Sequence, residues 1–268
     1  MQSNNVYVPL VTPLSQTSSV CEQSVNNLVN YTKTYVTGFI PCLTSGEGWL
    51  LNPTQWETMC RYTRLAAPNH QVIAGIEKPT TEEVINYAKL AENIGANGVM
   101  ITTPFGDKIS QDEIIEHYRR VHDSVGINVY IYNESELSNN LTSESTLLTI
   151  SELERVRGIK DSSNSDKLQS LIAKLKVNNV IFFQGWENKI ANLSRQTGNI
   201  CSLSNLYPRL CFEAANTPSE NTQTLIHNLC EHHNIFDPRW YAYIKDHLKN
   251  LNLITNNYTL DKDFGETS

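Results

Sequence analysis

Residues 128–162, NVYIYNESELSNNLTSESTLLTISELERVRGIKDS, hold one complete strand–helix–strand unit. Asn128–Asn133 is short and rich in β-branched and aromatic residues, which is typical of a buried strand. Thr142–Val156 repeats its apolar residues at helical spacing, and Gly158–Ser162 is again a short apolar strand. Two neighbouring parallel strands need a crossover of this length, which is usually a helix. The stretch therefore predicts one βαβ unit of a parallel sheet.

The same alternation extends from this unit in both directions. Further strands are expected at Asn5–Leu14, Gly38–Thr44, Gln71–Lys78, Gly98–Phe105, Val180–Gly185 and Ile200–Leu206. Further helices are expected at Ser19–Val36, Asn52–Leu65, Thr80–Ile94, Ser110–Val125, Asp166–Val177, Asn188–Gln196 and Pro208–Ala215. Eight strand–helix units of about 25 residues predict a (β/α)8 TIM barrel, a fold of typically about 250 residues. An open doubly wound sheet is the alternative, but the first turn lacks a glycine-rich nucleotide motif.

The pattern changes after Thr217-Pro218, where only helical spacing remains. Two helices are expected, at Glu220–His233 and Pro238–Leu251, before a polar tail that starts at Asn256. The sequence therefore predicts a barrel over residues 1–217 and a short C-terminal helical extension over residues 218–268.

The composition is that of an ordinary acidic globular protein. The net charge of -7 gives no attraction to nucleic acid or to an anionic membrane surface. No apolar run approaches the roughly 20 residues that span a bilayer, and the N-terminus lacks the features of a secretory signal. The six cysteines form no C-x-x-C pair and are expected to be reduced. We expect a cytoplasmic protein with neither nucleic acid nor membrane as a partner.

Lys160 is the most informative residue for function. It lies within the short apolar strand Gly158–Ser162, where burying an ammonium group without a partner costs free energy. Desolvation favours the neutral form of an amine, which can attack a carbonyl carbon and form an imine. A protonated imine then withdraws electrons while a carbon–carbon bond is made or broken. The alternative is a lysine at the barrel rim that pairs with Asp161.

Tyr132 ends the neighbouring strand and shares a face with Tyr130. The active site of a TIM barrel lies at the C-terminal ends of its strands, so we expect Lys160 within reach of Tyr132. A phenol at that place can relay protons to and from a carbinolamine, although packing is the alternative role. Thr44-Ser45-Gly46 follows another strand, and its hydroxyls and backbone N–H groups suit a carboxylate, although a plain turn is the alternative.

Five segments carry a family resemblance, and they occur in the family's order with matching separations. They are Leu10–Leu14, Leu43–Glu47, Thr102–Phe105, Tyr130–Asn133 and Gly158–Ser163. Over about residues 5–215 the chain resembles the dihydrodipicolinate synthase / N-acetylneuraminate lyase family of pyruvate-dependent class I aldolases. The last segment is the most specific, because it matches the motif that holds the family's lysine.

The resemblance implies roles for the residues at the strand ends. Lys160 would be the Schiff-base lysine and Tyr132 the proton-relay phenol, while the turn Thr44–Gly46 would bind the carboxylate. The substrates would be a 2-oxo acid such as pyruvate and an aldehyde, and neither a metal nor an organic cofactor is needed. The family's oligomers imply a homodimer or homotetramer, packed partly through the loop after the fourth strand.

Several positions depart from the family's pattern. Members that make dihydrodipicolinate usually have an Arg for the second substrate's carboxylate where this chain has Leu137, and a Pro where it has Ser135. Gly106 stands in place of one of two aromatic residues, one of which reaches a neighbouring subunit's site. The third member of the usual proton relay is therefore absent or replaced.

The turn after the third strand, glycine-rich in the family, reads Gly75-Ile76-Glu77-Lys78. We expect Lys78 to form a rim ion pair with Glu77 or Glu47.

Two further positions are candidates for sugar hydroxyls. Leu137-Ser138 and Gly185–Asn188 resemble the sialic-acid lyase branch, in which the second segment contacts a polyol. Glu187 and Ser202 could bind a polyol here, although Glu187 is not the residue that this branch normally uses. The alternative is that Glu187 caps the helix that follows it.

The leading hypothesis is a lyase or aldolase that cleaves, or in reverse condenses, a 2-oxo acid and an aldehyde through an imine on Lys160. The second is a 4-hydroxy-tetrahydrodipicolinate synthase without the usual Arg, which would lose a bidentate contact to its substrate. The third is a barrel that binds a 2-oxo acid without catalysing turnover.

Overall fold

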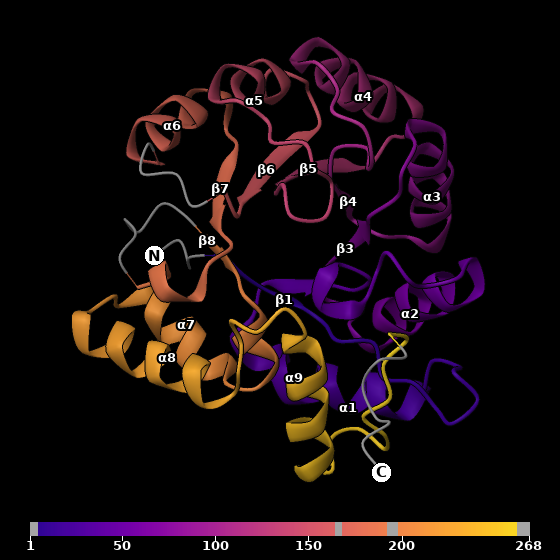
Figure 1. Ribbon diagram of the computed structural model, residues 1–268, viewed down its shortest axis with the longest axis vertical. Helices are drawn as coiled ribbons and strands as arrows, with labels where there is room; N and C mark the ends of the chain where they lie inside the picture. Colours follow the sequence, from indigo (N-terminus) through magenta and orange to yellow (C-terminus); the bar gives the residue numbers. More distant parts are fainter. Residues whose placement is uncertain (1–4, 164–167, 192–197, 262–268) are drawn as a thin grey trace.

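The computed structural model describes residues 5–163, 168–191 and 198–261. Its parallel strands follow one another around a closed barrel in chain order, with the last strand beside the first (Figure 1). They are β1 (Val6–Pro9), β2 (Gly38–Ile40), β3 (Gln71–Ile76), β4 (Gly98–Ile101), β5 (Asn128–Asn133), β6 (Val156–Asp161), β7 (Ile181–Gln184) and β8 (Gly198–Ile200). The predicted (β/α)8 barrel is confirmed, and the open sheet is excluded.

Helices surround the barrel and connect its strands (Figure 1). The α-helices of the described ranges are α1 (Glu22–Thr32), α2 (Pro53–Ala66), α3 (Thr81–Ile94), α4 (Gln111–Ser124), α5 (Glu144–Ser151), α6 (Leu168–Leu175), α7 (Pro208–Asn216), α8 (Glu220–His232) and α9 (Trp240–Asn250). Short 3₁₀ helices are η1 (Lys33–Tyr35), η2 (Thr44–Gly46), η3 (Lys176–Asn178), η4 (Glu187–Lys189) and η5 (Ser202–Asn205). None of the helices within these ranges has the length and apolar character that a bilayer crossing requires.

The inside of the barrel is filled by large aromatic rings that face glycines. Tyr7 stands opposite Gly38, Tyr130 opposite Gly158, and Phe183 opposite Gly198 in the strand register. A Cβ atom at Gly158 would lie 2.5 Å from a ring carbon of Phe183, so only glycine leaves room there. Alternation of small and large residues is the usual way to fill a narrow barrel. This layer forms the floor beneath the strand ends.

Several expected strands are longer than the observed ones, such as Asn5–Leu14 for β1 and Gly98–Phe105 for β4, and two elements are assigned wrongly at one end. The last strand is Gly198–Ile200, and not Ile200–Leu206, because the chain turns into η5 after Ile200. The Ser204 hydroxyl donates to the Cys201 carbonyl at 2.5 Å, a local bond of the kind that competes with sheet pairing. The expected helix Thr142–Val156 is also too long, since α5 ends at Ser151 and Val156 begins β6.

Parts of two expected helices lie outside the described residues. These parts are residues 166–167 of the helix expected at Asp166–Val177 and residues 192–196 of the helix expected at Asn188–Gln196. Within the described residues, α6 and η3 occupy most of the first, and only the end of η4 falls in the second.

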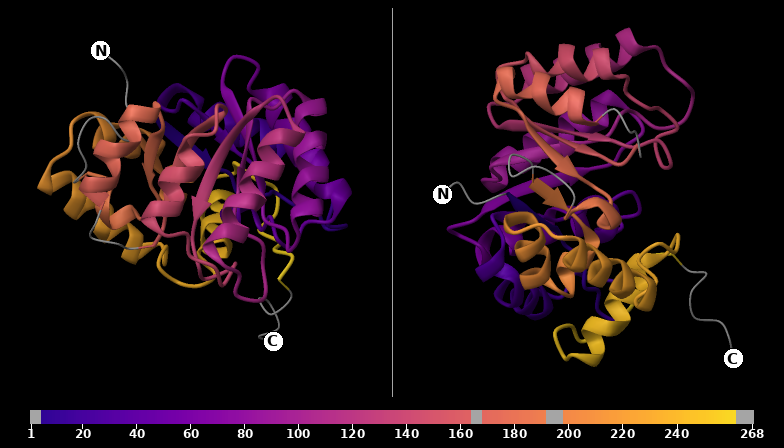
Figure 2. Two further views of the ribbon diagram at one scale, coloured as in Figure 1. Left: turned by 90° about the horizontal axis from the view of Figure 1, so that it is seen from above. Right: turned by 90° about the vertical axis from the view of Figure 1, so that its left-hand side faces the viewer.

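The C-terminal helices lie on the side of the barrel that carries α1 and α7, as both views show (Figures 1 and 2). α8 packs on α7 and η4, and α9 packs on η2 and η5, at the C-terminal ends of the strands. Two atoms of Glu47 hold this arrangement, since Lys245 of α9 donates to one carboxylate oxygen and the Leu260 amide donates to the other. The extension predicted from residue 218 therefore contacts the end of the barrel where the strand-end residues lie, while its boundary remains a prediction.

Candidate active site

Lys160 points into the barrel from the C-terminal end of β6. Its side chain is 5% exposed, and its Nζ lies 3.8 Å from the ring centroid of Tyr132. The two residues are direct partners in the register of β5 and β6, so the expected proximity of Lys160 and Tyr132 is found. Gly185 after β7 gives Lys160 its space, because a Cβ there would lie 3.2 Å from Lys160 Cε and 2.9 Å from the Asp161 carbonyl oxygen.

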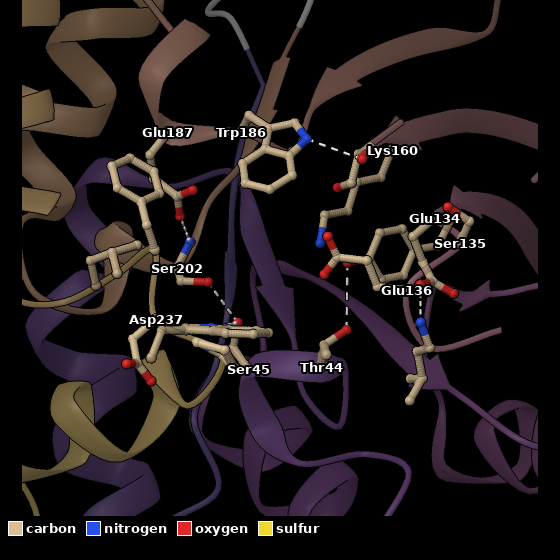
Figure 3. Close-up of a pocket in the computed structure, with 18 residues that line it drawn as sticks. Thr44, Ser45, Glu134, Ser135, Glu136, Lys160, Trp186, Glu187, Ser202 and Asp237 are labelled. Atoms are coloured by element: carbon tan, nitrogen blue, oxygen red, sulfur yellow. Dashed lines mark hydrogen bonds between the residues drawn. The ribbon is translucent and has the colours of Figure 1, made fainter. Parts of the chain in front are cut away.

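A cavity of about 330 Å³ opens at these strand ends (Figure 3). Its volume is at the lower end of the range for small-molecule sites. Six of the predicted site residues line it together, namely Lys160, Tyr132, Thr44, Ser45, Glu187 and Ser202. Figure 3 shows Lys160 and Thr44 on one side of the cavity, with Glu187 and Ser202 on the other.

The Thr44 hydroxyl connects Tyr132 to a buried carboxyl group. Thr44 Oγ1 lies 2.5 Å from Glu77 Oε1 and 3.5 Å from Tyr132 Oη, within range of a hydrogen bond to each. Glu77 is 1% exposed, and burial raises its pKa to about 8 despite the Thr44 hydrogen bond, which lowers it. The nearby Glu134 carboxylate raises the pKa of Glu77 further. Thr44 can therefore pass a proton between Tyr132 and Glu77.

A second hydrogen-bonded group lies across the cavity. The Ser45 and Ser202 hydroxyls are 2.8 Å apart, and Trp240 Nε1 donates to Ser45 Oγ at 3.3 Å. Glu187 Oε1 accepts from the backbone N–H of Ser202 at 2.6 Å and from that of Leu203 at 3.4 Å. Because Trp240 donates to Ser45, the Ser45 hydroxyl keeps its own proton for Ser202 or for a ligand.

Glu187 therefore stabilises the start of η5 through these two N–H groups. Its carboxyl group is buried, which raises its pKa, while the backbone N–H donors lower it.

Gly46 lies behind the cavity lining. Its carbonyl accepts from the Thr12 hydroxyl at 2.6 Å, and a Cβ at Gly46 would meet the Leu10 carbonyl oxygen at 2.7 Å. Gly46 thus lets the turn pack closely on the segment after β1, which sets the position of Thr44 and Ser45.

The loops after β4 and β5 are joined by Asn140. Its side-chain amide donates to the carbonyls of Pro104 and Asp107, and its oxygen accepts from the Ile109 amide. Gly106 in the first loop has φ +110°, a backbone conformation that L side chains rarely adopt. An aromatic residue at 106 would strain this loop. In the second loop, Leu137 lines the cavity, and its amide donates to Glu134 Oε2 at 2.8 Å.

Neither the alternative pairing of Lys160 with Asp161 nor the expected pairing of Lys78 is formed among the described residues. Lys160 does not pair with Asp161, whose carboxylate accepts instead from Asn133 Nδ2 at 2.7 Å and from the Ser163 hydroxyl at 2.9 Å. The two side chains point to opposite faces because successive residues of a strand alternate.

The predicted pairing of Lys78 with Glu77 or Glu47 is also wrong. Lys78 lies over the Tyr87 ring and near the carbonyls of Gly48 and Leu51.

The sequence did not predict the contribution of the C-terminal extension to the cavity. Ile235, Phe236, Asp237, Pro238 and Trp240 line it. No signal in the sequence pointed to them, because they follow no strand. Within the described ranges, no group of three or more His, Cys, Asp or Glu side chains is arranged to hold a metal ion.

A (β/α)8 barrel with a buried lysine at the end of its sixth strand has the architecture that a lyase of the class I aldolase type requires. Comparison with known proteins gives the family. The model of the dihydrodipicolinate synthetase family matches residues 2–261. This chain belongs to that family, as the sequence motifs predicted.

A relative agrees with this assignment, and solved structures share the fold. The 4-hydroxy-tetrahydrodipicolinate synthase of Anaplasma marginale (strain St. Maries) is 30% identical over 219 residues, which are 80% of this chain and 72% of the relative. The dihydrodipicolinate synthase of Acinetobacter baumannii, solved with pyruvate, has a TM-score of 0.87 at 22% identity, over 97% of this chain and 92% of that one. A dihydrodipicolinate synthase variant described as the first monomeric one has a TM-score of 0.85 at 23% identity, over 96% and 89%.

Proposed function

We propose that this protein is a lyase that cleaves, or in reverse condenses, pyruvate and an aldehyde through an imine on Lys160. The observation that carries the proposal is the buried Lys160 amine beside the Tyr132 ring, in a cavity that also holds the Thr44 and Ser45 hydroxyls. The relative from Acinetobacter baumannii, whose structure was solved with pyruvate, supports the choice of 2-oxo acid.

The chemistry follows from the positions of these groups. The neutral Lys160 amine attacks the C2 carbonyl carbon of pyruvate, and the carbonyl oxygen takes a proton from the Tyr132 hydroxyl. The carbinolamine then loses water and becomes a protonated imine. Loss of a C3 proton gives an enamine, whose C3 attacks the aldehyde carbon, and the cleavage reaction is the reverse of this step. The Ser45 hydroxyl and the turn Thr44–Gly46 hold the carboxylate.

The lining of the cavity favours an aldehyde without negative charge. Its carboxyl groups are Glu134, Glu136, Glu187 and Asp237, and Lys160 is its one basic side chain among the described residues. An anionic aldehyde would meet like charges here and would lack a bidentate partner. Hydroxyl groups, in contrast, can donate to these carboxylates, as a polyol at Glu187 and Ser202 would. We therefore infer a neutral hydroxyaldehyde as the second substrate.

The alternative of a 4-hydroxy-tetrahydrodipicolinate synthase has the names of several relatives in its favour. Leu137 lines the cavity where an Arg would be needed, which is why we rank this reaction second.

Borohydride trapping tests the proposal. The protein is incubated with pyruvate and sodium borohydride, and the adduct is mapped by mass spectrometry, with Lys78→Met as a control that removes the other buried strand-end lysine. We expect the adduct on Lys160 in the wild type and in Lys78→Met, and none in Lys160→Met. No adduct on Lys160 would refute both enzyme reactions.

Substrate assays then separate the alternatives. Release of pyruvate from sialic acid or from 2-oxo-3-deoxy sugar acids would support the lyase, whereas condensation with aspartate semialdehyde alone would support the synthase. An adduct without turnover of any aldehyde would indicate a binding protein.

We also propose that the protein is cytoplasmic and forms a homodimer or homotetramer. All six cysteines are unbonded, including Cys42 and Cys60 with Sγ atoms 3.7 Å apart, which fits a reducing compartment. Light scattering on the purified protein measures its molar mass and thus the number of subunits. A monomer, as described for one dihydrodipicolinate synthase variant, would contradict the proposal.

A further inference from the structure

Glu77 is a buried carboxyl group that the reaction described above does not use. It follows β3, where its side chain is 1% exposed, and its Oε2 has no hydrogen-bond partner within the described part of the chain. Oε2 packs against Gly48, where a Cβ would approach it to 3.1 Å. An orphaned buried oxygen on an acidic side chain costs stability, so its presence calls for a functional reason.

The remaining oxygen of Glu77 connects to the catalytic groups. Oε1 lies 2.5 Å from Thr44 Oγ1, a short separation for two oxygen atoms, and Thr44 Oγ1 lies 3.5 Å from Tyr132 Oη. The Tyr132 ring in turn lies under Lys160 Nζ. The second distance is long, but such bonds are often long before substrate binds. One line of oxygen atoms thus extends from the interior carboxyl group to the imine site.

We propose that Glu77 is the proton store of the active site, acting on Lys160 chemistry through Thr44 and Tyr132. This inference rests on the proposed imine function. Glu77 touches no substrate atom itself, and it therefore acts as a positioning and proton-donating residue behind the Tyr132 phenol. The Thr44 hydroxyl then serves the relay, which leaves the Ser45 hydroxyl as the side-chain donor for the substrate carboxylate.

The surroundings of Glu77 keep it protonated near neutral pH. Burial is the largest influence on its pKa, which is about 8, followed by the Thr44 hydrogen bond, which lowers it. The titratable groups that face Glu77 are Glu134 after β5, Lys160 on β6, Lys78 beside it in sequence, Cys42 after β2 and Tyr132 on β5. The two lysines favour the carboxylate and Glu134 favours the acid. A neutral acid at rest can therefore donate when the reaction needs a proton.

The proton balance of imine formation uses Glu77 once. The amine adds to the carbonyl, and a proton passes from Glu77 through Thr44 and Tyr132 to the substrate oxygen. The carbinolamine nitrogen then passes one of its protons to the hydroxyl oxygen, and as the carbon–oxygen bond breaks that oxygen leaves as water. In sum, a neutral amine, a ketone and a neutral carboxyl group give a protonated imine, a water molecule and the Glu77 carboxylate. The imine then loses its C3 proton to Tyr132, and a proton passes from Tyr132 through Thr44 to the Glu77 carboxylate. The products are the enamine and the neutral Glu77 acid.

All members of this relay belong to one chain. Gly106 supplies no side chain to the site, and Glu77 stands in the turn that is glycine-rich in the family. The relay therefore does not require a residue from a neighbouring subunit.

Hydrogen–deuterium exchange at the pyruvate methyl group tests the inference without knowledge of the aldehyde. The loss of the methyl proton signal in D₂O is followed by NMR across pH 5 to 10 for the wild type, Glu77→Gln and Glu77→Asp. The matched control is Glu57→Gln, the same change at an exposed residue that pairs with Arg61 on α2. Borohydride trapping on each protein reports imine formation separately.

We expect exchange by the wild type to fall as the pH rises through about 8, where Glu77 loses its proton. Glu77→Gln should lower the maximal exchange rate by about 100-fold, at the low end for general acid–base catalysis, and should lose this limb of the profile. The pyruvate concentration for half-maximal exchange should change by less than about 3-fold, since Glu77 does not contact substrate. Glu77→Asp should still show a fall in exchange rate at high pH, at a different pH from the wild type, and should recover part of the exchange rate that Glu77→Gln loses.

Three results would overturn the inference. If the wild type traps pyruvate on Lys160 and Glu77→Gln exchanges at the wild-type rate with the same profile, Glu77 is structural and the imine function stands. If Glu77→Gln does not fold, an unchanged profile in Glu77→Asp leads to the same conclusion. If the wild type traps no pyruvate, both the relay and the proposed function fail.

Discussion

Lys245 and Glu47 form an ion pair in which both side chains are fully buried. Glu47 directly follows the turn Thr44–Gly46, whereas Lys245 is on α9, so the pair joins the C-terminal extension to the site. Lys245 Nζ also donates to the Tyr258 carbonyl at 2.8 Å. Burial lowers the pKa of Lys245, and Glu47 opposes this effect.

Removing one partner of this pair should destabilise the protein strongly. Lys245→Met leaves the Glu47 carboxylate buried without its counter-charge, and we expect a loss of about 3–5 kcal/mol in the free energy of unfolding by urea. The double variant Glu47→Gln/Lys245→Met should recover much of this loss. Lys249→Met, an exposed lysine on the same helix, is the control and should change stability by less than about 0.5 kcal/mol. Equal effects of the two single lysine variants would contradict the argument.

Tyr132→Phe should slow imine formation while the fold is retained. The ring still packs under Lys160, but the proton-transferring hydroxyl is lost, so the rate of borohydride-trappable imine formation should fall about 100-fold. Tyr130→Phe is the matched control, because Tyr130 lies on the same strand face but one layer deeper, against Phe183. A comparable loss in both variants would show that the tyrosines act through packing.

Gly185→Ala should displace the catalytic lysine. The new methyl group would collide with Ser162 Oγ and would lie 2.9 Å from the Asp161 carbonyl oxygen, which cannot move without shifting β6. It would also lie 3.2 Å from Lys160 Cε. We expect a destabilisation of about 1–3 kcal/mol and a slower reaction with pyruvate, measured by urea unfolding and trapping rate. In Gly126→Ala the new methyl group would meet only the flexible end of Glu92, so this control should retain the wild-type trapping rate. Wild-type trapping by Gly185→Ala would refute the requirement for glycine.

Where the fold could be predicted from the sequence, local pattern and tertiary packing agreed. Asn52, Thr80 and Ser110, the first residues of three expected helices, are N-caps whose side chains each accept a hydrogen bond from the third residue of the helix. Asn128–Asn133 is a strand over its whole predicted length. Val156 was assigned to a helix because an apolar residue fits either spacing in so short a stretch, and the chain turn that ends α5 has no Gly or Pro to mark it.

The sequence could predict those parts of the site that the barrel strands themselves bring together. Strand order and register bring Lys160 to Tyr132, and they follow from the fold class. Trp240 could not be predicted as a site residue. Its hydrogen bond to Ser45 joins residues 195 positions apart, and it forms because the C-terminal extension, which has no strand pattern, packs on the barrel. Glu77 was seen at its strand end, but its burial and its bond to Thr44 depend on how neighbouring strand ends fill the space, which residue type does not reveal.

His117 should limit stability in acid. It is buried on α4, with Nδ1 2.9 Å from Thr81 Oγ1 and Nε2 3.1 Å from the Thr102 carbonyl oxygen. Burial lowers its pKa from 6.5 to about 4, so the folded protein holds the neutral ring where the unfolded chain binds a proton. The stability that His117 contributes is therefore present above pH 6.5 and is lost as the pH falls through 4. The difference amounts to about 3 kcal/mol at one pKa unit per 1.36 kcal/mol.

Glu77 changes stability with pH in the direction opposite to His117. The test therefore compares each variant with the wild type at each pH. Its raised pKa gives stability that is present below pH 4.5 and is lost as the pH rises through about 8. We expect the urea unfolding free energy of His117→Gln to fall less than that of the wild type between pH 6.5 and 4, because the variant has no ring to protonate. His227→Gln, at an exposed histidine on α8, should instead follow the wild-type curve. If His117→Gln runs parallel to the wild type, protonation of this ring does not drive the loss of stability in acid.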